Sequence, residues 1–237
     1  MGNWSAQQIL TQVTGELGLP APRGLASNDA QTTQLYALLN AAGNELLFFP
    51  WERFKKTWTF TTQGNEGAYS LPADFGYFEL QTQYNRSSGW PLQGPKSPQE
   101  WAWIKNSKIS LTTRFRYRII GGKFSMLPVP EDAQEISMEY MCNTWIQPSD
   151  STKTPKSMVD DPNDIVLYDP WLIVKFIKLK FYELKGFDTT GVRTDFMRVF
   201  GSLTGRDEGA RVLSMVPGGS TSFYIGDGSI PESSWNE

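Results

Sequence analysis

The chain has 237 residues, of which 39% are hydrophobic and 20% charged, so it can fold around a sizeable core and is not intrinsically disordered. It contains no histidine and a single cysteine, which excludes Ser-His-Asp and Cys-His nucleophiles, histidine-ligated metal sites and an intramolecular disulfide bond. The net charge of -3 argues against a broad surface for nucleic-acid phosphates. Because no long apolar run and no signal peptide are found, we expect synthesis in a cytoplasm and no membrane span. We also expect no cofactor.

Two amphipathic helices are predicted before residue 50. Ser5 suits the N-cap of the first helix, whose apolar positions recur at helical spacing as far as Leu17, and Gly18 ends it. Asn28-Asp29 caps the second helix, which ends before the aromatic cluster Phe48-Phe49-Pro50-Trp51. Both have the apolar stripe of an ordinary core-facing helix, which requires no bound ligand.

A mostly β-structured segment is predicted from residue 51 to 147. Alternating polar and aromatic residues predict a first hairpin, with strands at 57–62 and 68–71. Gly121-Gly122 predicts a second hairpin, because paired glycines suit a two-residue turn between strands at 114–120 and 123–127. Further strands are expected at 78–84, 90–92 and 136–146, with a short helix opening at Ser97. Cys142, in the last of these strands, is expected to be a buried and unreactive thiol.

The residues after 147 return to helical patterns. A polar loop precedes a helix that starts at Asp169-Pro170 and ends at Gly186. Trp171 is expected to be the first residue of the apolar stripe that this helix buries in the core. A further helix contains Phe196 and Leu213, although three glycines within it weaken the pattern.

Together these elements predict an α+β fold. Residues 1–50 plus 165–215 are expected to form a helical bundle domain, 51–147 a large β-rich insert, 148–164 a surface loop and 216–237 an extended C-terminal arm. The arm contains apolar residues that a solvated tail would not need, so we expect it to bind a neighbouring molecule. These residues are Phe223, Tyr224, Ile225, Ile230 and Trp235.

Two groups of charged residues are candidates for a binding role, and none is assigned to catalysis or to a metal. The aspartates at 160, 161 and 164 could bind calcium or magnesium, but they lack the spacing of a calcium loop and are expected to cap the following helix. Arg114, Arg116 and Arg118 alternate along a predicted strand, so they share one face and could contact phosphates or an acidic partner. Phe115, Tyr117 and Ile119 would then face the core, and a solvated face remains the alternative for the arginines.

Aromatic residues make up 14% of the chain, and 9 of them are tryptophans. We interpret this aromatic content as higher than a monomer needs to fill its own core. Trp and Tyr are favoured at protein interfaces, so the composition favours a protein that assembles.

Short motifs recur in a fixed order from the first helix to the end of the β-rich segment. They are Ala6–Leu10, Leu38–Gly43, Tyr69–Phe75, Gly94–Trp101, Arg116–Lys123, Leu127–Pro130 and Glu139-Tyr140 followed by Trp145. In order and spacing they resemble the head-to-tail adaptor proteins of short-tailed bacteriophages, a family that includes head-tail connectors and proteins similar to tail tubular protein A. The resemblance covers most of residues 5 to 186.

This resemblance implies a non-catalytic structural protein of the virion, located at the head-to-tail junction. The expected form is a twelve-membered ring that binds the portal protein on one side and the tail nozzle or tail tube protein on the other. It would continue the DNA channel, with genomic DNA as non-specific content.

Two other functions are compatible with the residues. One is a carboxylate-dependent cell-wall glycoside hydrolase of the phage tail, with acids such as Glu66 or Asp74, although no spacing singles out a pair. The other is a glycan-binding β-rich module in which surface tryptophans stack on sugars.

Overall fold

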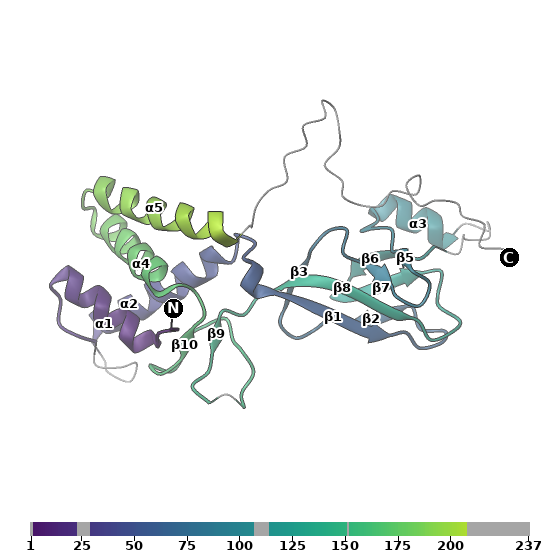
Figure 1. Ribbon diagram of the computed structural model, residues 1–237, viewed down its shortest axis with the longest axis horizontal. Coiled ribbons are helices and arrows are strands. Elements are labelled where there is room, and N and C mark those ends of the chain that lie inside the picture. The colour runs from purple at the N-terminus through teal and green to yellow at the C-terminus, as the bar shows by residue number, and fades with distance from the viewer. Residues whose placement is uncertain (1, 23–28, 107–113, 151, 208–237) are drawn as a thin grey trace, which may run out of the picture.

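The computed structural model describes residues 2–22, 29–106, 114–150 and 152–207. Figure 1 shows helices from both ends of the chain at one end of the molecule and the sheets at the other. The predicted α+β class, with a β-rich middle between N- and C-terminal helices, is therefore confirmed. The predicted arm and Leu213 lie outside the described residues.

The helical part is built around one central helix. Its members are α1 (Ala6–Leu17), α2 (Ala30–Leu46), α4 (Pro170–Lys185) and α5 (Thr190–Asp207). Helix α4 packs against each of the other three. The core between them contains Ile9, Leu10, Val13, Leu35, Leu39, Ile173, Val174 and Ile177, each at most 1% exposed. Burial of these apolar stripes, at about 25 cal/mol per Å², is the main stabilising contribution here.

The helix ends follow the predicted capping chemistry. Ser5 Oγ accepts a hydrogen bond from the Gln8 N–H, and Gln8 Oε1 accepts one from the Ser5 N–H, which forms a complete capping box. Asp29 and Asp169 cap α2 and α4 in the same way, each accepting from two backbone N–H groups. Gly18 ends α1 with φ 68°, a left-handed conformation that glycine adopts without strain.

The β-rich part consists of two main sheets. The strands are β1 (Lys55–Thr61), β2 (Ala68–Ser70), β3 (Phe75–Phe78), β4 (Tyr84–Asn85), β5 (Trp90–Pro91), β6 (Arg116–Ile120), β7 (Lys123–Leu127) and β8 (Glu135–Cys142). One sheet has the order β1-β8-β4-β5, with β3 also paired to β8, and the other has the order β2-β7-β6. A 3-10 turn, η1 (Glu52–Phe54), precedes β1, and α3 (Pro98–Asn106) follows β5.

Aromatic side chains fill the space between these two sheets. The rings of Trp58, Phe60 and Phe78 from the first sheet each lie within 6.0 Å of the ring of Phe124 in the second sheet. Phe124 is fully buried and stacks on Tyr117 at 5.1 Å. Such pairs stabilise by about 1 kcal/mol beyond the area they bury, so this cluster fixes how the sheets face each other.

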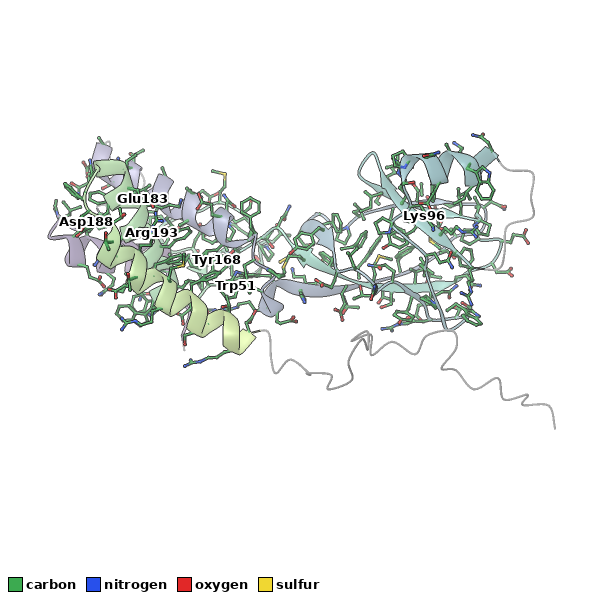
Figure 2. All side chains as sticks on the ribbon, turned by 90° about the horizontal axis from the view of Figure 1, so that it is seen from above. Trp51, Lys96, Tyr168, Glu183, Asp188 and Arg193 are labelled. Carbon is green, nitrogen blue, oxygen red and sulfur yellow. The ribbon has the colours of Figure 1, made fainter. Side chains whose placement is uncertain are left out.

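A small sheet of β9 (Ile146–Gln147) and β10 (Ile165–Val166) joins the two parts. Trp145, which precedes β9, is fully buried and donates its indole N–H to Ser157 O at 2.9 Å and to Asn44 Oδ1 at 3.1 Å. Figure 2 shows Trp51 and Tyr168 close together where the helices meet β1, and their rings are 6.2 Å apart. The helical and β-rich parts therefore share one continuous core.

Several sequence predictions of local structure are confirmed. Gly121 and Gly122, with φ 57° and 72°, form the turn of the β6-β7 hairpin. Ser97 and Glu100 exchange hydrogen bonds at the start of α3, and Cys142 is buried in β8. Helix α5 is continuous through Gly191, Gly201 and Gly205.

Other strand predictions are wrong. Strands 57–62 and 68–71 do not form a hairpin, because β1 pairs with β8 and β2 pairs with β7. The strand predicted at 78–84 is a turn between β3 and β4, with Gln81 at φ 65°, and the strand predicted at 136–146 is interrupted between β8 and β9. Trp171, expected in the core, is 42% exposed and contacts Trp4 at the edge of the helical part.

Candidate assembly interface

The helical part exposes an aromatic side chain where α2 ends. Phe48 is 86% exposed, whereas the adjacent Phe49 packs on Trp51 at 4.7 Å and on Phe200 at 5.5 Å. Phe48 borders a shallow, mostly apolar groove between the end of α2, α4 and α5. The groove is also lined by Glu45, Leu46, Phe49, Phe176, Phe196, Met197 and Phe200. Met197 on this groove is 57% exposed. Exposed apolar surface of this kind is typical of sites that bind another molecule, so the groove is a candidate assembly surface.

A second apolar region lies at the far end of the helical part. Leu184 and Phe187 are 57% and 56% exposed at the end of α4. Figure 2 shows the nearby Glu183 and Arg193, whose side chains form an ion pair of 3.1 Å between α4 and α5. A polar pair beside apolar surface resembles the rim and centre of a protein interface.

The β-rich part exposes tryptophan and isoleucine. Trp103 on α3 is 62% exposed, and Trp90 in β5 is 42% exposed beneath the guanidinium of Arg114, which lies 4.7 Å from the ring centroid. Ile119 and Ile120, at the end of β6, are 38% and 42% exposed. Both parts of the molecule therefore offer apolar surface to other chains.

The structure partly separates the three predicted arginines. Arg116 and Arg118 alternate in β6 on either side of the buried Tyr117, so they share a face as predicted, and both are half-buried. Arg114 precedes the strand and stacks on Trp90. Ile119 lies opposite the buried Phe124 and so shares the inner face with Tyr117 as predicted, although it is 38% exposed near the end of the strand.

The acidic cluster at 160–164 stabilises its own loop, and the expectation that it caps the following helix is wrong because Asp169 caps α4. Asp164 is 1% exposed and accepts hydrogen bonds from the N–H groups of Asp160 and Asp161, and Lys156 forms ion pairs with Asp160 and Asp164. Burial alone would lower the pKa of Lys156, but these two carboxylates outweigh it and raise that pKa. Within the described ranges, no group of three His, Cys, Asp or Glu side chains could hold a metal ion.

Asp74, one of the acids considered for glycoside hydrolysis, is held by two neighbours. It accepts hydrogen bonds from the Tyr140 hydroxyl at 2.9 Å and from the Lys56 ammonium. Burial alone would raise the pKa of Asp74, but these bonds outweigh it and hold the pKa below its ordinary value. Burial, together with the hydrogen bond to Asp74, raises the pKa of Tyr140. This carboxylate thus stays ionised, in a role that joins β1, β3 and β8.

The remaining predicted contacts, Phe223, Tyr224, Ile225 and Trp235, lie outside the described residues. Phe48 was not predicted as a contact, because the aromatic run that contains it also reads as an ordinary helix end.

An α+β subunit with exposed apolar surface on both its parts fits the class of structural assembly proteins. The family model of the SU10 adaptor protein matches residues 5–210, and the chain belongs to this family of phage head-to-tail adaptor proteins. It is therefore a structural phage adaptor, a virion component that assembles with copies of itself and with other head or tail proteins. Among curated proteins the comparison found no match. No helix in the described ranges has the length and apolar character to cross a lipid bilayer.

Proposed function

We propose that the chain forms a ring between the portal and the tail nozzle, or tail tube, of a short-tailed phage. The ring would contain twelve copies and continue the channel through which genomic DNA passes without sequence-specific contacts. The observation that supports this most strongly is the family match across nearly the whole described chain, together with apolar surface at both ends of the subunit.

We assign a different role in the particle to each part of the subunit. Residues 1–50 plus 165–215 would form the ring body, the insert at 51–147 would face a second layer of the particle, and 148–164 would form a surface loop. Arg114, Arg116 and Arg118 are proposed contacts for an acidic partner surface on the insert side. Phe223, Tyr224, Ile225 and Trp235 are proposed contacts of the arm.

The exposed groove beside Phe48 suits a closed ring. Ring closure requires one patch of a subunit to meet a different patch of the next, so each subunit uses two surfaces. Removing a Phe side chain from water contributes about 1.5–3 kcal/mol, and repetition around a circle multiplies modest contacts. No observation in the described part favours the hydrolase or the glycan-binding alternative.

Electron microscopy of the purified chain, alone and mixed with the portal protein of the same phage, tests this function. We expect rings with a central channel, and coaxial stacks when portal is added. A monomer that binds neither portal nor nozzle would contradict the proposal, and twelvefold symmetry in class averages checks the copy number.

A further inference from the structure

Strand β1 is an open edge of its sheet. It pairs with β8 along all seven residues, from Lys55↔Met141 to Thr61↔Glu135, and no strand pairs with its other side in the described chain. It is long for an edge in a sheet whose β4 and β5 have two residues each. Unpaired edge strands are templates for pairing with another segment.

The backbone groups that face outward can be identified. In an antiparallel pair, directly opposite residues alternate between hydrogen-bonded and non-bonded pairs. The Thr62 N–H donates to Gln134 O at 2.8 Å, which places Phe60 and Trp58 in the bonded series. Consistently, the Glu139 N–H donates to Thr82 Oγ1, away from β1.

Thr57, Thr59 and Thr61 are therefore the residues whose N–H and C=O groups point away from β8. None of these groups has a hydrogen-bond partner among the described residues. The three threonine side chains are exposed as well. The edge thus presents three evenly spaced pairs of donors and acceptors to another strand.

The inner face of this edge is also incompletely covered. Trp58 and Phe60 stack on each other at 4.4 Å and are only half-buried, although both pack against Phe124 of the second sheet. A strand added beside β1, with apolar side chains on this face, would bury them further.

The arm contains a segment with the sequence of such a strand. Thr221–Ile225 reads Thr-Ser-Phe-Tyr-Ile, with glycines at 219 and 226 near its ends. β-branched and aromatic residues bounded by glycine are typical of strands. Phe223 and Ile225 would share one face, and Ser222 and Tyr224 the other.

The chain also leaves the described structure beside β1. Asp207, the last residue of α5, accepts a hydrogen bond at 2.7 Å from the N–H of Glu52, which lies just before β1. The linker 208–220 can span about 45 Å when extended, roughly twice the length of β1. The linker is thus long enough to carry Thr221–Ile225 well away from the point where the described chain ends.

We propose that Thr221–Ile225 of one subunit pairs with the open edge of β1 in the next subunit of the ring, with Phe223 and Ile225 covering Trp58 and Phe60. This inference rests on the self-assembly in the proposed function. Arm and edge are different surfaces, so the contact is heterologous and can repeat around a closed ring.

Disulfide cross-linking tests the pairing. Because the strand register is open, Thr57→Cys and Thr59→Cys are each combined with Ser222→Cys and with Tyr224→Cys. We expect at least one pair to give a ladder of covalent oligomers on non-reducing gels. Thr59→Cys with Ser233→Cys, and the parent chain with its buried Cys142, are controls that should give none. Intramolecular cross-links, or no cross-links in assembled rings, would overturn the inference while leaving the ring function intact.

Amide exchange provides a second test that does not depend on engineered thiols. In the assembled protein the amides of Thr57, Thr59 and Thr61 should exchange at least about tenfold more slowly than in a Tyr224→Pro variant, because proline removes a ladder donor. The variant changes only the arm, and Ser233→Pro is its matched control. Equal exchange in all three proteins would also overturn the inference.

Discussion

Gly43 lies where helix α2 packs directly against the ring of Trp145. A Cβ atom at this position would lie 2.2 Å from the Trp145 ring, and the carbonyl of Gly43 accepts a hydrogen bond from the Tyr168 hydroxyl at 3.0 Å. Gly43→Ala should therefore destabilise the protein by about 2 kcal/mol, since overpacking outweighs the roughly 1 kcal/mol gained in helix propensity. Urea denaturation measures this difference.

Gly15 in α1 provides the matched control. A Cβ there would meet no atom within 4 Å, so Gly15→Ala should stabilise the protein by about 0.5–1 kcal/mol. Equal effects at both glycines would show that the contact with Trp145 does not restrict position 43.

Tyr117 is a second residue whose effect on the free energy of unfolding can be measured. Its hydroxyl is buried without a hydrogen-bond partner in the described structure, and burial raises the pKa of Tyr117 to about 12. Tyr117→Phe should leave stability unchanged or raise it by up to about 1 kcal/mol, because an unsatisfied hydroxyl is removed without a change of shape. Thermal denaturation measures the change, and a free energy of unfolding lower than that of the parent protein by more than about 1 kcal/mol would contradict this prediction.

At the scale of elements, helices were more predictable than strand partners. Caps at Ser5, Asp29 and Asp169 are local signals, and the residues that form them lie within one turn of each other. The pairing of β1 with β8 joins residues more than 70 positions apart, and no local pattern encodes it. Alternating polar and aromatic residues followed by a turn at Gly64–Gly67 are compatible with a hairpin and equally with a chain that crosses from one sheet to the other. The chain forms the crossing, since β1 and β2 belong to different sheets.

The contact between α1 and α4 depends on charge as well as apolar burial. Glu16 of α1 forms ion pairs with Lys178 at 2.7 Å and Lys175 at 3.3 Å, both on α4. Burial alone would raise the pKa of Glu16, but the bonds from Lys178 and Gln12 outweigh it and lower the pKa below its ordinary 4.5. The contribution to stability is thus complete above pH 4.5 and is lost as the pH falls through the lowered pKa.

Glu16→Gln should accordingly cost about 1 kcal/mol at neutral pH, and the difference from the parent protein should shrink below the ordinary pKa of the carboxyl group. Denaturation curves at a series of pH values measure it. Glu183→Gln, which removes the exposed pair with Arg193, is the control and should cost at most about 0.5 kcal/mol. A difference for Glu16→Gln that is constant with pH would contradict this role.

At the scale of the whole molecule, the sequence predicted the fold class and an assembly role but only part of the interface. The order of the motifs and the high aromatic content indicated a chain that binds others, although most aromatic side chains of the described part lie in or against its own core. The exposure of individual residues depends on packing between distant elements, so Phe48 and Trp171 were read as helix-end and core residues. The arm contacts remain predictions.

Phe48 tests whether the exposed groove is an assembly surface. Phe48→Glu should leave the subunit's stability within about 0.5 kcal/mol, because the side chain is almost fully exposed in the single chain. It should nevertheless shift rings to monomers, since each contact would lose about 1.5–3 kcal/mol of apolar burial and gain a buried charge. Sedimentation velocity measures the change in mass.

Ala37→Glu is the matched control, because Ala37 is exposed on α2 at a distance along the helix from the groove. It introduces the same charge and should leave rings intact. Rings that persist in Phe48→Glu would assign closure to the other exposed apolar regions, at Leu184 and Phe187 or at Trp103. Loss of rings in Phe48→Glu alone would mean that side-chain burial at the end of α2, and not net charge, holds neighbouring subunits together.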